Sequence, residues 1–408
     1  MVVHDGMEAV DTARRKGIVL EPFHHQVGGH MSMLRYDDHT VCKPLVYQEQ
    51  NFYESLPVAM RQFTPEYRGI VSVSLMEDSR GHLTMIASPQ NDIPGPLLSA
   101  ESSISIWHQF KLGKSSGGAQ TLSNWKHSAL RKTLSESCHG TSLRRTELQV
   151  HTELTCHLED SNGNQKGSAD SNPWGLKCHR KQLSRMSTEY HKNQLHRFLL
   201  LENVTSKFYW PCVLDLKMGK RQHGDDATEE KKFRHMKKCA QSTSASLGVR
   251  FCGMQVYQTN TGSYICKDKY YGRKLSADGF RQALYHFLHN GQRLRTDLIE
   301  SIIFQLKSLK SVIEGQTSYR FYSSSLLIIY EGHEPAEHSS TSDKHPTSTP
   351  DSGPGNIFPR VDVRMIDFAH TTYQGSRNNH TTYEGPDQGY IFGLESLVQI
   401  LQGIQEGE

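Results

Sequence analysis

The sequence predicts an α+β fold in which antiparallel strands are combined with amphipathic helices. Residues 211–219 alternate apolar and polar side chains, as a strand with one buried face does. Residues 250–258 and 263–267 flank an Asn-Thr-Gly turn, which is typical of a hairpin. Residues 279–290 and 296–314 carry apolar side chains at helical spacing and each segment ends at a glycine. At 408 residues the chain is long enough for two or three domains or lobes.

The composition, the N-terminal pattern and the cysteine spacing together predict an intracellular protein. It is 36% hydrophobic and 22% charged with a net charge of +3, so its basic residues matter through local clustering rather than through their total. No apolar run approaches the roughly 20 residues of a membrane helix, and the N-terminus lacks a signal-peptide pattern. The eight cysteines form neither a CxxC pair nor a zinc-ligand spacing, which favours free buried thiols. We therefore expect a protein of the cytoplasm and also of the nucleus.

The N-terminal part, residues 19–93, is rich in predicted strands. A glycine turn at residues 26–30 separates two extended segments, and residues 40–46 form a further strand that carries Lys43. Judged by pattern alone, Lys43 is an exposed strand lysine. Residues 49–63 have helical spacing, and Glu54 on this helix is a candidate partner for the Lys43 ammonium by analogy with protein kinases.

The stretch from residue 211 to residue 238 carries the strongest chemical pattern. Alternation of period two puts Asp215 and Lys217 on the same strand face, where a carboxylate and an ammonium are costly to bury without partners. Asp226 and Glu229 have capping-box spacing, so a helix is expected to begin there. One face of that helix is basic and should bind a strongly anionic group; it comprises Lys231, Arg234, His235 and Lys238.

Two further strands are predicted at residues 322–330 and 361–367. The second ends at Asp367, and a carboxylate at a strand end can coordinate Mg²⁺ that bridges ATP phosphates. His370-Thr-Thr-Tyr373 is repeated at residues 380–383, which we interpret as loop structure in which His370 alone contacts substrate. 

A family resemblance rests on these residues. Pro211, Asp215, Lys217 and Gly219 match the PxxxDxKxG motif of the inositol polyphosphate kinases. The continuation KMGKRQHGDDATEEKKFRHMKKCAQSTSASLGVR resembles the inositol hexakisphosphate kinase branch, and the ending ILQGIQEGE is most similar to its type 3 members. The resemblance covers residues 17–93 and 172–408.

The resemblance implies a two-lobed, kinase-like fold: a small strand-rich N-lobe covers ATP, and a hinge leads to a larger α+β C-lobe with antiparallel strands. Low-complexity segments rich in Ser, Gly and His are expected to be disordered linkers, and they are candidate docking segments for protein partners. The expected organisation is a flexible N-terminus (1–16), the N-lobe (17–95), a disordered insertion (96–172), the end of the N-lobe with the hinge (173–204), and the C-lobe (205–408), which a second disordered insertion (332–357) interrupts.

The resemblance also implies ATP and Mg²⁺ as cofactors and assigns roles to individual residues. Asp215, Lys217 and Asp367 are the expected catalytic residues, and Asp367 with Ser325 is expected to hold the metal. For Asp215 the resemblance favours the ATP ribose, with the metal or the acceptor as alternatives. The remaining ATP contacts are expected from Lys43, from the backbone of Glu202 and Val204, and from Asn203 between them. The expected substrate contacts are Lys217, Lys231, Lys232, Phe233, Arg234, His235, Met236, Lys237, Lys238 and His370.

The implied reaction is transfer of the ATP γ-phosphoryl group to a phosphate of inositol hexakisphosphate, and also of the pentakisphosphate, at the 5-position. Such an acceptor is already largely ionised near neutral pH, so no general base is required. Two alternatives stay open. A multikinase would act on ring hydroxyls, and a non-enzymatic binder would dock its basic helix on nucleic acid, anionic lipid or protein. A nucleic acid is not an expected partner, because a binder has no use for Lys43, Asp215 and Asp367 together.

Overall fold

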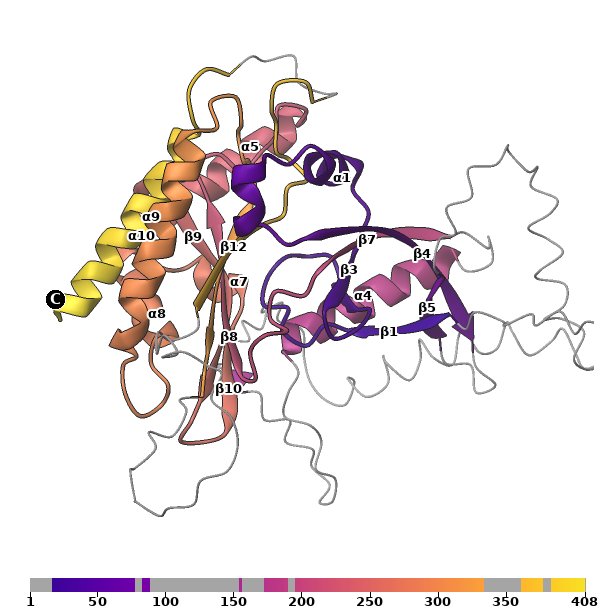
Figure 1. Cartoon of the computed structure of the whole chain (residues 1–408), viewed down its shortest axis with the longest axis horizontal. Helices are drawn as coiled ribbons and strands as arrows, with labels where there is room; N and C mark the ends of the chain where they lie inside the picture. Colours follow the sequence, from indigo (N-terminus) through magenta and orange to yellow (C-terminus); the bar gives the residue numbers. More distant parts are fainter. Residues whose placement is uncertain are drawn as a thin grey trace, which may run out of the picture. The chain divides into compact units, whose positions relative to one another are not determined.

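The computed structural model describes residues 17–77, 83–88, 154–155, 172–189, 195–333, 361–376 and 383–407, all within one compact unit (Figure 1). Helices and two antiparallel sheets make up these residues, which confirms the mixed α+β class. The predicted flexible N-terminus 1–16 lies outside the described residues. So do the predicted insertions 96–172 and 332–357, apart from residues 154–155, 172 and 332–333.

The first sheet is a closed barrel with the strand order β1-β2-β3-β7-β4-β5. Its interior is apolar and includes Leu34, Val73 and Phe198, all of them buried. The strands are β1 (Ile18–Pro22), β2 (Leu34–Arg35), β3 (Thr40–Pro44), β4 (Tyr67–Glu77), β5 (Leu83–Ser88) and β7 (His196–Glu202).

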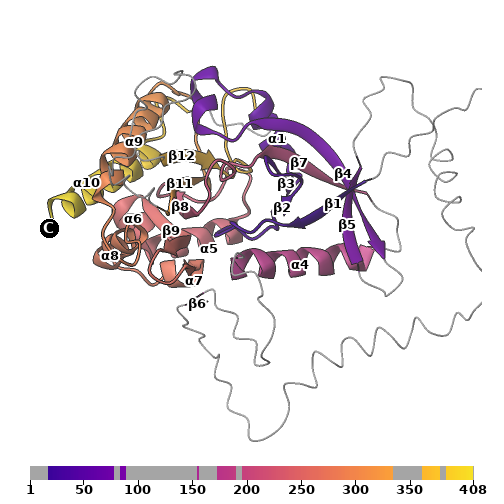
Figure 2. The ribbon, with the colours of Figure 1, turned by 60° about the horizontal axis from the view of Figure 1, so that its bottom comes forward.

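Two helical segments belong to the N-terminal part. The helix expected over residues 49–63 is in fact two elements, α1 (Tyr47–Glu54) and the 3₁₀ helix η1 (Val58–Phe63). Pro57 lies at the break, because a proline lacks the N–H that would continue α1. Helix α4 (Pro173–Glu189) runs along the barrel beside β1 and β5, as Figure 2 shows.

The second sheet has six strands in the order β12-β11-β8-β9-β10-β6. Its register places Ser325 beside Lys217 on one side and beside Ile366 on the other. Lys217, Ser325 and the residue after Ile366, Asp367, therefore lie at the same end of three adjacent strands. The strands are β6 (Leu154–Thr155), β8 (Pro211–Met218), β9 (Val249–Gln258), β10 (Ser263–Lys267), β11 (Ser325–Glu331) and β12 (Val361–Ile366).

Long helices cover one face of this sheet (Figure 1). They are α8 (Ala277–Phe287), α9 (Ile299–Glu314), which follows the 3₁₀ helix η3 (Thr296–Leu298), and α10 (Gln388–Glu406). Their apolar stripes form the main core with the sheet, as the spacing of residues 279–290 and 296–314 predicts. Three further helices lie along the chain between β8 and α8: α5 (Glu229–Ala240), α6 (Thr243–Leu247) and α7 (Lys269–Gly272).

Two predictions about compartment can be compared with the described residues. Six cysteines fall within them and all six are free thiols, as expected: Cys42, Cys178, Cys212, Cys239, Cys252 and Cys266. None of the helices that the structure describes is long and apolar enough to span a membrane.

Candidate functional site

An ion-pair cluster joins the barrel to the second sheet. Nζ of Lys43, on β3, lies 2.8 Å from Oε1 of Glu49 and 2.5 Å from Oδ1 of Asp367. Glu49 is fully buried in the first turn of α1, and its Oε1 also accepts a hydrogen bond from the backbone N–H of Phe368 at 3.2 Å. The expectation that Glu54 pairs with Lys43 is wrong, because Glu54 accepts from Gln50 instead.

Asp367 is held in a special backbone conformation. Its φ of +67° is left-handed, a region that non-glycine residues seldom occupy. Burial alone would raise the pKa of this carboxyl group, but Lys43 and Lys217 outweigh burial and hold the pKa at about 2. Burial would likewise lower the pKa of Lys43, and Asp367 and Glu49 raise it instead. Both groups are therefore charged at neutral pH.

Asp215 lies beneath the glycine turn of residues 26–30. Its side chain is almost fully buried, and Oδ1 has no hydrogen-bond partner among the residues described. Burial, followed by the charge of Asp367, raises the Asp215 pKa to about 6. A Cβ atom on Gly28 would lie 1.8 Å from Oδ2 of Asp215, so only glycine fits there. The carbonyl of Gly28 accepts hydrogen bonds from Gln26 and from Trp174, each 3.1 Å long.

The strand ends at Asp367 and Ser325 carry the oxygen atoms that could bind a metal ion. Ser325 is buried next to Lys217, and the Asp367 side chain is 29% exposed. Within the described part of the chain, no three His, Cys, Asp or Glu side chains come together as a metal cluster. A kinase-type Mg²⁺ site does not need one, since one or two carboxylates and phosphate oxygens complete the coordination. The ionised Asp367 fits that role.

Segment 202–204 connects the barrel to the second sheet. Oε2 of Glu202 accepts from the backbone N–H of Glu66 and from Nη1 of Arg364, each at 3.1 Å. The Asn203 amide donates to the carbonyl of Asp38 at 2.9 Å. Val204 is buried in a small apolar cluster whose other buried members are Val27, Phe208, Val213, Leu327 and Ile329.

The N-cap of helix α5 lies two residues beyond the predicted one. Thr228 is the N-cap and accepts from the Lys231 N–H at 3.3 Å, so the prediction of a cap at Asp226 is wrong. Nδ1 of His235 lies 2.8 Å from the carbonyl oxygen of Gln222. Burial lowers the pKa of His235, and Lys238, Lys231 and Lys217 lower it further although the Gln222 contact opposes them. Lys231 and Lys238 of α5 and Lys217 of β8 therefore lie near His235 and make this face of α5 basic.

His370 joins this basic group. It lines a cavity of about 320 Å³ together with Tyr47, Asn51 and Asp226. Burial, followed by the charge of Lys231, lowers the His370 pKa to about 4, and Asp226 opposes the shift. The structure thus brings together four of the predicted substrate contacts, Lys217, Lys231, His235 and His370, and Lys238 extends the same face.

Four other predicted contacts lie on different parts of α5. Lys232 pairs with Glu229 at 2.7 Å. Phe233 and Met236 are 69% and 60% exposed, and Lys237 is also exposed. Helical periodicity turns these side chains away from the face of Lys231 and His235. Arg234 is mostly exposed but lies near Lys238. The pKa of Lys238 is lowered by burial first, then by the charge of Arg273 and by that of Arg234.

Two residues of the site were not predicted from the sequence. His30 is the last residue of the glycine turn. Burial lowers its pKa, and the nearby Asp367 carboxylate partly offsets that effect. Arg250 is the cross-strand neighbour of Lys217 on β9. The Gly-Gly-His sequence could have indicated His30, whereas Arg250 becomes recognisable only through the strand register.

Comparison with known proteins identifies the family of the chain. A family model described as inositol polyphosphate kinase matches residues 198–402. The chain is 58% identical to inositol hexakisphosphate kinase 3 of Homo sapiens over 100% of both chains. It is 49% identical to inositol hexakisphosphate kinase 1 of Rattus norvegicus, over 96% of this chain and 94% of that protein, and 44% identical to the type 2 enzyme of Homo sapiens, over 96% of each. 

A solved structure is also similar. The inositol phosphate multikinase Ipk2 of S. cerevisiae, in complex with ADP and Mn²⁺, matches at 27% identity with a TM-score of 0.42, over 51% of this chain and 84% of that one. Taken together with the full-length relatives, the family match shows a phosphotransferase of the inositol polyphosphate kinase class. Within that class, the chain belongs to the inositol hexakisphosphate kinases. The resemblance to this branch and to its type 3 members is confirmed.

Proposed function

We propose that the protein transfers the γ-phosphoryl group of ATP to a phosphate of inositol hexakisphosphate, and also of the pentakisphosphate, and so forms diphosphoinositol products at the 5-position. One observation carries the proposal. Asp367, which pairs with Lys43, lies at the same end of the sheet as Lys217. Lys217 in turn lies near the basic group of Lys231, His235 and His370. A site that binds two polyanions needs a group that holds a metal ion with one of them and a basic group beside it for the other.

The nucleotide side of the proposal is a kinase-like arrangement in which the barrel covers ATP. Lys43 would neutralise ATP phosphates, and the backbone of Glu202 and Val204 would hold adenine against the apolar cluster around Val204, with Asn203 between them. The side chain of Glu202 is engaged by Glu66 and Arg364 and its N–H by the Glu66 carbonyl, so its backbone carbonyl would contact the nucleotide. The unpartnered Oδ1 of Asp215 supports a ribose hydroxyl as its ligand, because a buried acceptor is costly without a donor.

Asp367 would hold Mg²⁺, with Ser325 as a further oxygen beside it. The low pKa of Asp367 supports this role, because the carboxylate is ionised throughout the physiological range. When bound, Mg²⁺ supplies charge neutralisation on the phosphates of ATP. Lys43 and Lys217, whose charges lower the pKa of Asp367, would orient the same phosphates.

Transfer then requires positioning rather than proton removal. An acceptor phosphate oxygen forms a bond to the γ-phosphorus while the bond from that phosphorus to the β–γ bridging oxygen breaks, and ADP leaves. Lys217 would contact the transferred group, and Lys231 with the rest of the basic face would hold the other acceptor phosphates. His370 would bind as a neutral hydrogen-bonding group, since its pKa is about 4.

The free thiols support the cytoplasm and the nucleus as the compartments of this reaction, because thiols persist where glutathione is reduced. Immunofluorescence of the tagged chain tests that part of the proposal.

The reaction is tested by incubating the full chain with Mg·ATP and inositol hexakisphosphate and recording ³¹P NMR spectra of the products. We expect a new phosphoanhydride signal that grows with ADP in equal amounts, and its loss in Lys217→Met. A wild-type protein that releases inorganic phosphate alone would contradict the proposed acceptor.

A further inference from the structure

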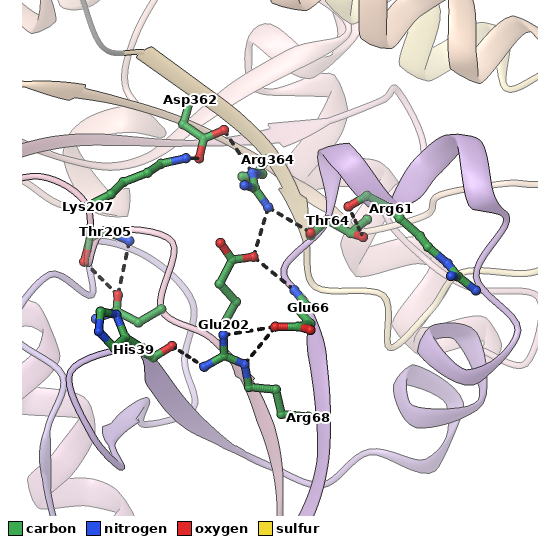
Figure 3. Close-up of polar contacts among 11 residues, drawn as sticks. His39, Arg61, Thr64, Glu66, Arg68, Glu202, Thr205, Lys207, Asp362 and Arg364 are labelled. Atoms are coloured by element: carbon green, nitrogen blue, oxygen red, sulfur yellow. Dashed lines mark hydrogen bonds and ion pairs between the residues drawn. The ribbon is translucent and has the colours of Figure 1, made fainter. Parts of the chain in front are cut away.

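Arg364, in the middle of β12, joins three segments that are far apart in the sequence (Figure 3). Its Nη1 donates to the carbonyl of Thr64 at 3.0 Å and to Oε2 of Glu202 at 3.1 Å. Its Nε donates to Oδ1 of Asp362 at 2.9 Å. The Arg364 side chain is only 13% exposed, so these bonds are formed in a partly desolvated setting, where charged hydrogen bonds are stronger than in water.

Glu202 completes the link from the other side. The oxygen that accepts from Arg364 also accepts from the Glu66 N–H, and the Glu202 N–H donates to the Glu66 carbonyl at 2.9 Å. Residues 64–66, where η1 leads into β4, are thus held by the end of β7 and by β12 together. We call the Glu202–Arg364 pair the clamp.

The clamp lies between the two ends of the proposed nucleotide site. Arg364 is three residues before Asp367, and it shares a strand face with Ile366, which packs against the apolar cluster of Val204. Glu202 is two residues before Val204. A rigid connection at this point sets the separation between segment 202–204 and the carboxylate of Asp367.

We propose that Arg364, acting through Glu202, is a positioning residue for ATP that holds segment 202–204 and the strand of Asp367 at the spacing that the nucleotide requires. The inference rests on the proposed function in one respect, namely that ATP lies between these two segments. It predicts that loss of the clamp weakens nucleotide binding and leaves acceptor binding intact. The hydrogen bonds described for the Arg364 and Glu202 side chains go to residues 64–66, to Asp362 and to each other, and not to α5.

The test measures binding of Mg·ATP by isothermal titration calorimetry without acceptor, together with the KM values for ATP and inositol hexakisphosphate. Arg364→Met keeps the apolar stem and removes all three donor contacts, so we expect the Kd and KM for ATP to rise about tenfold. The KM for the acceptor should stay within about twofold. Arg364→Lys should recover part of the loss, since one ammonium can reach one partner at a time.

Glu202→Gln provides an independent route that leaves the fold intact, because the amide oxygen still accepts from the Glu66 N–H. We expect it to weaken Mg·ATP binding in the same direction, and we expect Glu202→Gln with Arg364→Met to be no worse than Arg364→Met alone. Arg68→Met is the matched control. Arg68 donates to Glu66, Thr40 and the His39 carbonyl, all on the barrel side, so ATP affinity should stay within about twofold.

The proposal is overturned if folded Arg364→Met and Glu202→Gln bind Mg·ATP as the wild type does, or if both KM values rise equally. If Arg364→Met does not fold, the Glu202→Gln titration decides alone. A wild-type chain that binds Mg·ATP yet forms no pyrophosphate refutes the proposed function and leaves the clamp standing, so the two failures are distinguishable.

Discussion

Nζ of Lys43 lies 2.5 Å from Oδ1 of Asp367, although 324 positions separate the two residues in the chain. The contact joins a barrel strand to the end of a strand in the second sheet. The buried Glu49 stabilises it, because the Glu49 carboxylate accepts hydrogen bonds from both Lys43 and the N–H of Phe368, the residue after Asp367. A buried ion pair of this kind is costly to break from one side, because the remaining charge is then uncompensated.

Replacement of Asp367 should abolish transfer and spare the fold. Asp367→Asn keeps the shape of the side chain and removes the negative charge that would hold Mg²⁺, while Glu49 continues to pair with Lys43. We expect turnover to fall by at least about a thousandfold, which corresponds to about 4 kcal/mol. Turnover and thermal melting are measured on the same preparation, and a well-folded variant with normal turnover would refute the role of Asp367.

Glu49 should contribute more to stability than its neighbour on the same helix. Glu49→Gln keeps an acceptor for the Phe368 N–H but removes the charge that faces Lys43, so we expect the free energy of unfolding to fall by about 2 to 4 kcal/mol. Glu54→Gln is the matched control and should stay within about 0.5 kcal/mol. Urea denaturation of both variants checks the difference, and equal effects would mean that the Lys43–Glu49 pair is unimportant.

Charge reversal on α5 should separate acceptor binding from nucleotide binding. When Lys231, Arg234 and Lys238 are changed to Glu, we expect the KM for inositol hexakisphosphate to rise at least a hundredfold, because each lost charged contact is worth roughly 1.5 to 3 kcal/mol. The KM for ATP should change by less than about threefold. Steady-state kinetics with each substrate varied in turn measures both values.

Lys307→Glu, on the exposed side of α9, controls for the effect of a single charge reversal outside the basic face of α5. It should leave both KM values within about twofold. Equal increases for ATP and acceptor in the triple variant would show that the helix is structural or serves the nucleotide.

His370 should make the fold sensitive to mild acid. Its pKa is about 4 in the folded protein against an ordinary value of 6.5, so between these pH values the unfolded chain binds a proton that the folded chain does not. Stability is therefore lost as the pH falls from about 6.5 to 4. After allowance for partial exposure, we expect about 1 to 2 kcal/mol.

His370→Asn should remove that part of the pH dependence, whereas His333→Asn, at an exposed position, should preserve it. Chemical denaturation at pH 7, 6, 5 and 4 provides the comparison. Parallel curves for wild type and His370→Asn would show that this histidine is not protected from protonation by the fold.

Local patterns were enough to predict the strand of Asp215 and Lys217, because a period-two alternation and a terminal glycine are properties of adjacent residues. The long helices followed from the same kind of signal. The mixed α+β class was therefore predictable, and so were the strand ends that carry Lys217 and Asp367.

Features set by tertiary geometry were not predictable in that way. The choice of Glu49 over Glu54 depends on where α1 begins and on which turn of it faces Lys43, and both carboxylates have plausible spacing. The cap of α5 was misplaced because Asp226 and Thr228 are both good capping residues. Arg250 and the Glu202–Arg364 clamp depend on strand pairing between distant segments, which no local pattern encodes.

The proposed transfer of a phosphoryl group to inositol hexakisphosphate is tested most directly by product analysis. The chain is incubated with Mg·ATP and a panel of inositol phosphates from the tris- to the hexakisphosphate. We expect pyrophosphate products from the hexakisphosphate and the pentakisphosphate, with the greatest kcat/KM for the hexakisphosphate. Phosphorylation of ring hydroxyls on the less phosphorylated members, with no product from the hexakisphosphate, would contradict the proposed reaction.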